Sequence, residues 1–275
     1  MKRILIPTDF SPCAKNALKV GAAIAAATGA EILLLHVLYT TIGLEKIPAR
    51  LADYPEVKSA VTKGKNSLKR EEENPVLKNI TVSTAIEVGT ASQVILFTAR
   101  KWKADLIIMG SHGNEETNHP FVGSTAQKIL RGADVPVLCV QKNHTLKNIK
   151  KITFASNFEP GSEKASGQLL EFAKTLNASV QLLYVNTPLN FKDTRYIHER
   201  FDWFEKNSIK LNYSRAIHCD YDVHKGIANY LADTKDGIAS LVTRTRQGLP
   251  SYTLGVAESV AYHSPVPVLS VNYSK

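Results

Sequence analysis

The chain has 275 residues, which suits two domains of ordinary size rather than one. Hydrophobic residues make up 44% and charged residues 21%, the composition of a globular protein that buries a core. The formal net charge is +9, with 18 basic against 13 acidic residues in 1–143 (+5) and 16 against 12 in the remainder (+4). Because this charge is spread over both halves, it does not indicate a nucleic-acid-binding protein. No run of 18 apolar residues occurs, so the sequence predicts no membrane-spanning helix.

The N-terminus has the basic start of a signal peptide, but its apolar run ends at Pro7 and no small-residue cleavage site follows. We therefore expect a first strand here and a cytoplasmic protein. The cysteines Cys13, Cys139 and Cys219 are odd in number and far apart, which argues against a disulfide framework or a zinc knuckle. Cys13 opens a helix and is either a reactive thiolate or, the reading we favour, an ordinary small residue. The histidines lack metal-ligand spacing, so no metal site is expected.

Strands and helices alternate through the first half of the chain. Residues 3–8 are an Ile- and Leu-rich run, typical of a strand buried on both faces. Ser11 and Pro12 supply the N-cap and first position of a helix, and Gly29 supplies its end. The elements expected after it are strands at 31–38, 79–86 (an edge strand), 104–109 and 135–140 and helices at about 50–73, 90–102 and 123–132. Strands joined by helices of this length require parallel crossovers, which gives a five-stranded, doubly wound sheet.

The second half of the sequence repeats the first. Two basic residues, an apolar strand and a turn with an Asx residue, a Phe and a Pro occur at 2–12 and again at 150–160. Two further pairs of segments match in the same order, 32–37 with 180–185 and 135–140 with 266–271. We therefore predict two tandem α/β domains, residues 1–142 and 149–275, each with a mostly parallel, Rossmann-like sheet of five strands. Residues 141–148 are polar and aperiodic, as in a short linker.

A glycine-rich segment follows the fourth strand. Ligands on doubly wound sheets bind beyond the carboxyl ends of the strands, where the strand order reverses. The strand at 104–109 leads into Gly110-Ser111-His112-Gly113, and Gly123-Ser124-Thr125 opens a helix after nine more residues. Glycine lets the backbone bend and approach a ligand closely. Because the N–H groups at a helix start favour an anion and the two hydroxyls add donors, the segment predicts a phosphate-binding loop.

With these motifs the sequence resembles the universal stress protein family in its tandem-domain form. The resemblance rests on Pro7-Thr8-Asp9-Phe10-Ser11, His36-Val37, the Gly110/Gly113/Gly123/Ser124 loop and Val135-Pro136-Val137. It covers the whole first half and continues more weakly through the second. It implies a fold like that of the adenine nucleotide alpha hydrolases and an ATP-binding member of the family.

The resemblance also implies which residues hold the nucleotide. Asp9, after Pro7 and Thr8, would contact ribose or adenine, Val37 would meet adenine through its backbone, and Met109 would line the pocket. The residues implied for the phosphates are Gly110, Gly113, Gly123, Ser124 and Thr125. In this family the last strand commonly pairs domains, so the strands at 135–138 and 266–269 are expected to pair within the chain, and a homodimer stays open.

Several of these residues also have plainer readings. Instead of contacting a ligand, Asp9 could cap the helix that begins near Ser11, and Gly123-Ser124 could simply begin a helix. For both we favour ligand contact. His36 is expected to be a packed or hydrogen-bonded histidine, and His112 either touches phosphate or is a solvated loop residue.

Glu115 and Glu116 stand just after the second glycine, where family members often carry a basic residue. Carboxylates there repel a triphosphate unless a divalent cation such as Mg²⁺ lies between them. The pair therefore indicates side chains turned to solvent, weak ATP affinity, or metal-assisted binding.

The second half has lost the parts of this loop. Asn157 replaces the aspartate, Thr243-Arg244-Thr245-Arg246-Gln247-Gly248 replaces the first glycines, and Val256-Ala257 after Gly255 replaces the Ser-Thr pair. Arg244 and Arg246 either hold another anion or, as we favour, are solvated. We expect this half to keep the fold for packing and not to bind ATP.

No Walker loop, nucleophile elbow or zinc-protease helix is present, and no general base is evident beside the loop. The sequence therefore predicts a regulatory, stress-response protein that binds ATP as an adenine nucleotide and hydrolyses it slowly at most. The alternative is an interaction module that recognises a protein, an anionic or a small hydrophobic partner, its loop being a remnant. A true ATP-cleaving enzyme is a third reading.

Overall fold

The computed structural model describes residues 1–39, 55–113, 123–144, 149–234, 237–244 and 255–273. The strands of the first half are β1 (Arg3–Pro7), β2 (Glu31–Tyr39), β3 (Val82–Gly89), β4 (Leu106–Gly110) and β5 (Val137–Val140). Those of the second half are β6 (Lys151–Ala155), β7 (Ser179–Asn186), β8 (Tyr213–Cys219), β9 (Ile238–Arg244) and β10 (Val268–Tyr273). All of them belong to one ten-stranded sheet, in the order β3-β2-β1-β4-β5-β10-β9-β6-β7-β8.

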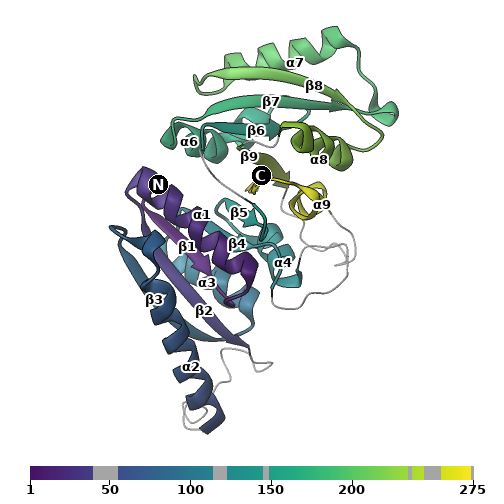
Figure 1. The fold of residues 1–275 in the computed structure, drawn as a ribbon. Helices are drawn as coiled ribbons and strands as arrows, with labels where there is room; N and C mark the ends of the chain where they lie inside the picture. The colour runs from purple at the N-terminus through teal and green to yellow at the C-terminus, as the bar shows by residue number, and fades with distance from the viewer. Residues whose placement is uncertain (40–54, 114–122, 145–148, 235–236, 245–254, 274–275) are drawn as a thin grey trace.

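The two halves of this sheet have the same topology. Within each half every pair of neighbouring strands is parallel, and the order β3-β2-β1-β4-β5 is repeated as β8-β7-β6-β9-β10. The doubly wound α/β fold expected from the sequence is therefore confirmed, and β3 lies at the sheet edge as its alternating pattern predicts. The two five-stranded sheets are joined edge to edge into one sheet (Figure 1).

Helices cover both faces of the sheet. The helices of the first half are α1 (Pro12–Thr28), α2 (Pro55–Glu72), α3 (Ala91–Trp102) and α4 (Ser124–Gly132); those of the second are α5 (Ser162–Ala165), α6 (Gly167–Thr175), α7 (Thr194–Asn207), α8 (Val223–Thr234) and α9 (Val256–His263). Short 3₁₀ turns lie at Pro75–Leu77 and Pro188–Asn190. Side chains of α1, α2, α6 and α7 fill one core cluster, and those of α3, α4, α8 and α9 fill the other.

The ends of α1 follow the local signals in the sequence. The Ser11 side chain accepts a hydrogen bond from the Ala14 N–H, and Pro12 takes the first helical position. Gly29 ends the helix with φ +70°, a conformation that costs glycine little. In the second half the corresponding segment is split into α5 and α6, with Gly161 at φ +97° before α5.

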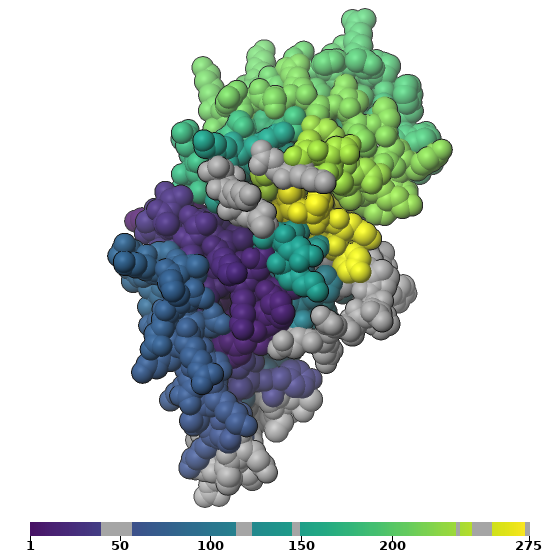
Figure 2. Space-filling model, viewed as in Figure 1, coloured from purple at the N-terminus to yellow at the C-terminus, as the bar shows by residue number. Residues whose placement is uncertain are grey.

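The two halves meet through an antiparallel strand pair, the pairing expected from the repeated Val-Pro-Val segments. In the register of β5 and β10, Leu138 lies opposite Leu269, and both side chains are fully buried. In the space-filling view the yellow C-terminal segment lies between the two halves (Figure 2). Because the pair is antiparallel, the carboxyl ends of the strands of the two halves point to opposite edges of the sheet.

Two amide side chains cap helices across this junction. Gln141, just after β5, donates from Nε2 to the carbonyls of Ala261 and Tyr262 at the end of α9 (3.0 and 2.5 Å). Asn272, at the corresponding place in β10, donates from Nδ2 to the carbonyls of Leu130 and Ala133 at the end of α4 (2.8 and 2.9 Å). The carbonyl groups in the last turn of a helix have no donor within the helix, and here each half supplies donors for the last helix of the other half.

The beginning of the predicted linker is part of the same interface. His144 is 3% exposed; its Nδ1 accepts from the Gln141 N–H (3.0 Å) and its Nε2 contacts the Ser264 carbonyl (2.9 Å). Asn16 of α1 donates to the carbonyls of Gln141 and His144 (both 2.7 Å). Residues 141–144 are thus a docked turn rather than a plain connector, whereas 145–148 lie outside the described residues.

A buried ion pair completes the junction. Arg131 of α4 donates from Nε to Oε1 of Glu258 in α9 at 2.7 Å, with side chains 18% and 5% exposed.

Within the described residues, no helix is long and apolar enough to cross a membrane.

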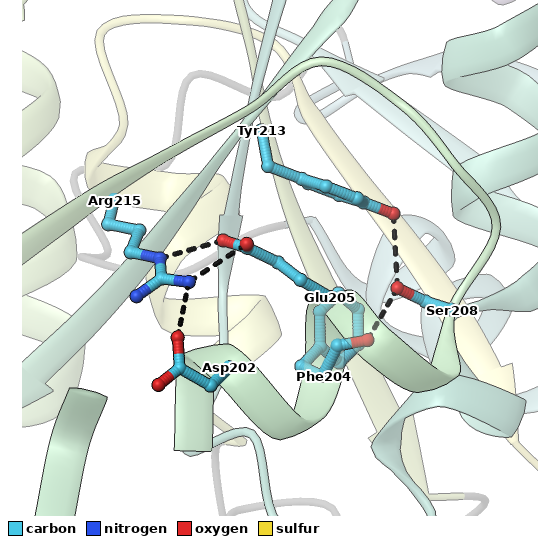
Figure 3. A network of polar contacts seen from close by, with 6 residues as sticks. All are labelled: Asp202, Phe204, Glu205, Ser208, Tyr213 and Arg215. Carbon is cyan, nitrogen blue, oxygen red and sulfur yellow. Dashed lines mark hydrogen bonds and ion pairs between the residues drawn. The ribbon is translucent and has the colours of Figure 1, made fainter. Parts of the chain in front are cut away.

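The outer edge of the second half is closed by a polar network between α7 and β8 (Figure 3). Arg215 of β8 donates to Glu205 (2.8 Å) and Asp202 (2.7 Å) of α7. The hydrogen bond to Glu205 raises the pKa of the guanidinium above its usual value, and the bond to Asp202 adds to this. Ser208 bridges the Phe204 carbonyl and the Tyr213 hydroxyl (2.6 and 3.1 Å), so α7 holds the beginning of the edge strand β8.

Candidate functional site

The candidate site lies where the strand order of the first half reverses. Strands β1 and β4 are neighbours, while the chain continues outward to β2 and β3 on one side and to β5 on the other. Asp9 follows the end of β1, and Gly110 is the last residue of β4. Two of the sequence motifs are thereby brought to one edge of the sheet, at the crevice where doubly wound folds bind ligands.

A tight turn after β1 positions Asp9. Thr8 accepts at Oγ1 from the Phe10 N–H, and Asp9 accepts at Oδ1 from the Ser11 N–H (both 3.0 Å). Phe10 adopts φ +64°, which the two side-chain hydrogen bonds support. The helix cap expected as the plainer role of Asp9 belongs instead to Ser11. Asp9 is an exposed Asx-turn residue that uses one carboxylate oxygen within the turn.

Strand β2 braces this turn. The Thr8 N–H donates to the Leu35 carbonyl (2.8 Å), and Nδ1 of His36 donates to the Thr8 carbonyl (2.8 Å). The rings of Phe10 and His36 lie 4.6 Å apart. His36 is therefore a packed, hydrogen-bonded histidine, as expected. Because backbone groups alternate along a strand, the N–H and C=O of Val37 face the same side as the Leu35 carbonyl, beyond the end of β1.

Two glycines of the loop lie where a side chain has no room. A Cβ at Gly110 would come within 2.8 Å of the Cys13 Cβ and 3.0 Å of the Ala14 nitrogen, so α1 packs directly on the loop backbone. A Cβ at Gly113 would come within 2.8 Å of Asp9 Oδ2. The second carboxylate oxygen of Asp9 therefore points at the loop. The motifs at 9 and 113, far apart in sequence, form one surface.

The loop also reaches the start of α4. The Ser111 N–H donates to the Val140 carbonyl and the Ser111 carbonyl accepts from the Gly123 N–H (both 2.9 Å). Gly123 is the N-cap of α4 without a side-chain cap bond, which leaves the N–H groups of Ser124 and Thr125 without partners inside the helix. Ser124 is exposed and Thr125 is half-buried. Free N–H groups, the helix dipole and two hydroxyls form an arrangement that favours an anion.

The remaining predicted residues lie under this surface. Pro7 and Thr8 are buried at the end of β1. Met109 is 6% exposed and belongs to the core cluster against which Val37 packs, so it borders the site from below. Residues 114–122, including Glu115 and Glu116, lie outside the described residues.

His112 has partners that sequence reasoning missed. Its Nδ1 lies 2.9 Å from Ser111 Oγ, and its ring lies 5.3 Å from the ring of Tyr262 in α9, at an interplanar angle of 64°. His112 is half-buried and is not the solvated loop residue of the plainer reading. No local pattern near position 112 could have indicated a contact with a residue 150 positions away. Across the parts of the chain that are described, no group of three or more His, Cys, Asp or Glu could hold a metal ion.

The second half keeps the turn but has no glycine at the place of Gly110. Phe158 donates to Ser156 Oγ (3.1 Å) with φ +52°, and Glu159 donates to Asn157 Oδ1 (3.5 Å), which repeats the turn after β1. In the sheet register, Met109 pairs with Cys139 and Leu241 pairs with Ser270, so Val242 occupies the place of Gly110. A valine there prevents the close helix approach seen at Gly110, in keeping with the divided helix α5–α6.

Comparisons with known proteins agree with the geometry. A family model described as "Universal stress protein family" matches residues 1–141. A universal stress protein of Methanocaldococcus jannaschii is 31% identical over 157 residues, which cover 52% of this chain and 97% of the relative. One from Thermus aquaticus is 34% identical over 145 residues, covering 51% and 98%. The crystal structure of a universal stress protein from Archaeoglobus fulgidus aligns with a TM-score of 0.74 over 98% of both chains at 18% identity, which shows a common fold for both halves.

Proposed function

The chain belongs to the universal stress protein family, and we propose that it binds one adenine nucleotide, ATP, in its first half. The observation that carries the proposal is the convergence of Asp9, the Gly110–Gly113 loop and the start of α4 on one edge of the sheet. The backbone of this loop is accessible because its glycines lack side chains, and the helix start offers unpaired N–H groups. Residues 1–142 form the binding domain and 149–275 its partner domain in this proposal.

The charges and hydrogen-bonding groups of the proposed site indicate where the ribose, the phosphates and the adenine would bind. The carboxylate of Asp9 repels phosphate but accepts hydrogen bonds from ribose hydroxyls, so ribose lies at Asp9. Phosphate lies at Gly113, Gly123, Ser124 and Thr125, where backbone N–H groups and hydroxyls donate. Adenine lies over Val37, whose backbone offers one donor and one acceptor, with Met109 below. Mg²⁺ would neutralise part of the triphosphate charge, and the proposal requires no protein ligand for it.

The role we propose is regulatory binding in the stress response of the cytoplasm, with slow hydrolysis at most. Beside the loop, Asp9 accepts from the Ser11 N–H at one carboxylate oxygen, and Nδ1 of His112 pairs with the Ser111 hydroxyl. The proposed role is binding, which requires no general base for water. Phosphate release above the uncatalysed rate that disappears in Asp9→Ala would favour the enzyme instead.

Isothermal titration of ATP with Mg²⁺ against a Gly113→Ala/Ser124→Ala variant tests the proposal. The Gly113 change displaces the Asp9 carboxylate, which is a mobile side-chain end, so binding is lost while the fold is retained. Gly167→Ala is the matched control, because a Cβ there meets nothing within 4 Å. Equal ATP affinity in all three proteins would contradict the proposed site.

A second candidate function, an interaction module, is favoured by one observation in the second half. Leu189, Phe191 and Tyr221 follow the carboxyl ends of the neighbouring strands β7 and β8 and are 90%, 69% and 84% exposed. Large apolar side chains gathered at one edge often mark a binding surface. Absence of binding heat with ATP and Mg²⁺ in the wild-type protein would favour this function over nucleotide binding.

A further inference from the structure

We propose that Tyr262, in the half that lacks the loop, is a positioning residue for the nucleotide loop of the other half. This inference rests on the proposed function, because it concerns the affinity of that same site. It makes the second half a fixed support of the loop rather than only a packing partner.

The contact begins with the ring of His112. This residue stands between Gly110 and Gly113, and its Nδ1 is tied to Ser111 Oγ at 2.9 Å. The Tyr262 ring meets the imidazole nearly edge-on at 5.3 Å between centroids. Edge-to-face ring pairs have a preferred geometry, so the contact restricts the rotation of the imidazole and of the backbone that carries it.

A second route connects Tyr262 with the same loop through the backbone. The Tyr262 carbonyl accepts from Gln141 Nε2 (2.5 Å), and Gln141 directly follows Val140, whose carbonyl accepts from the Ser111 N–H (2.9 Å). Ser111 is fully buried and accepts from the Gly123 N–H, which sets the start of α4. The end of α9 therefore holds both the loop and the helix start to which phosphate is assigned.

The opposite side of the junction shows what the contact adds. Since Gln141 and Asn272 cap corresponding helix ends, Leu130 corresponds to Ala261 and Arg131 corresponds to Tyr262. Arg131 turns to Glu258 and borders a cavity of about 240 Å³ next to Thr243 and Gly255. Each half thus presents the last turn of its last helix to the other half's loop edge. Only on the side that keeps the glycines does this turn place a ring against the loop.

The test is a comparison of Tyr262→Leu, Tyr262→Phe and a matched control, Tyr196→Leu, which removes a tyrosine of α7 in the same half, away from the junction. Tyr262→Leu should weaken ATP binding about three- to tenfold, as expected for loss of one aromatic pair. Tyr262→Phe, which keeps the ring, should retain the wild-type affinity, and Tyr196→Leu should leave it unchanged. Equal affinity of wild type and Tyr262→Leu would overturn the inference.

Two further measurements distinguish the positioning role from a loss of ATP affinity that is caused only by lower stability of the variant. In a double-mutant cycle with His112→Ala, the effects on ATP affinity should be less than additive, and additive effects would overturn the inference. The imidazole proton resonances of His112 should shift in Tyr262→Leu through loss of the ring current, without nucleotide present. If the wild type binds no ATP, the proposed function fails, and an unchanged His112 resonance would then contradict the positioning role separately.

Discussion

The two halves of this chain share a fold and a turn but differ at the place of Gly110, and the comparison separates residues that the fold requires from residues that it does not. The turn after β1 and the turn after β6 have equivalent hydrogen bonds, and φ is positive at both Phe10 (+64°) and Phe158 (+52°). One turn contains Asp9 and the other Asn157, so the turn itself requires only an Asx oxygen. The carboxylate of Asp9 is therefore not explained by the fold, and neither is the glycine at 113 that it faces.

The junction combines one feature that both halves share with one in which they differ. Gln141 caps the last helix of the second half, and Asn272 caps that of the first. Arg131 and Tyr262 occupy corresponding positions in these helices, but Arg131 pairs with Glu258 and Tyr262 packs on His112. A pair of caps preserved on both sides indicates that the two halves stabilise each other as one unit.

The largest expected effect comes from breaking the junction. Arg131→Met leaves the Glu258 carboxylate, 5% exposed, without its cation, and we expect a loss of about 3 kcal/mol in the free energy of unfolding. The control Arg131→Met/Glu258→Leu removes both charges and should recover most of this loss. Urea denaturation followed by circular dichroism measures both variants. Two separate unfolding transitions in the wild type would show that the halves unfold independently and would contradict their mutual stabilisation.

A smaller loss is expected where the halves differ in packing. Gly110→Ala forces a methyl group against Cys13 and the backbone of Ala14, which should cost about 1–3 kcal/mol. The corresponding change in the second half, Val242→Ala, shortens a half-buried side chain and should cost about 1 kcal/mol or less. Thermal unfolding of the two variants gives the comparison, which is contradicted if Gly110→Ala is the more stable.

The two Asx residues provide the next contrast. Asp9→Asn keeps an oxygen for the Ser11 N–H, as Asn157 does for the Glu159 N–H, but removes the charge at the proposed nucleotide site. We expect ATP affinity to fall about tenfold, the loss of a charge-assisted hydrogen bond, with stability changed by less than about 0.5 kcal/mol. Asn157→Asp should create no second site because Val242 stands at the place of Gly110. Calorimetric titration decides, and undiminished affinity in Asp9→Asn would remove Asp9 from the site.

The smallest effect concerns pH and the docked turn at 141–144. Burial lowers the pKa of His144 below its usual 6.5, opposed by the hydrogen bond to the Ser264 carbonyl. Because the unfolded chain then binds the proton more readily, the contribution of His144 is fully present above about pH 6.5 and is lost as pH falls below it, by at most about 1.4 kcal/mol per pH unit. His144→Gln should flatten this slope between pH 5 and 6.5, and the change Asn143→Gln at the exposed, uncharged neighbouring position should not. Identical slopes in all three proteins would contradict the assignment.

Local patterns in the sequence predicted the parts of the fold that local forces determine. The buried runs gave the strands, Ser11, Pro12 and Gly29 gave the bounds of α1, and the repeated segments gave the duplication. The predicted glycine loop and Asp9 lie together because parallel strands end at one edge. The thiol of Cys139 could be assigned to the interior only from the structure, where burial raises its pKa to about 12.

Contacts between the halves could not be predicted, because they depend on the register of β5 against β10. The residues at 141–144 look like a polar linker, yet Gln141 and His144 find partners only once α9 is in place. The ring of Tyr262 meets His112 for the same reason, and no spacing within either half indicates it. Sequence patterns indicate individual helices and strands, whereas the contacts at this junction form only when β5 pairs with β10.

The central claim is a single nucleotide site, in the first half. Its most direct test is quantification by mass spectrometry of the nucleotide released from the freshly purified, denatured protein, combined with titration of ATP and Mg²⁺ to saturation. We expect one adenine nucleotide per chain, retained in Thr243→Ala of the second half and absent from Gly113→Ala/Ser124→Ala. Two nucleotides per chain would show that the second half binds as well, and none, with no binding heat, would contradict the site altogether.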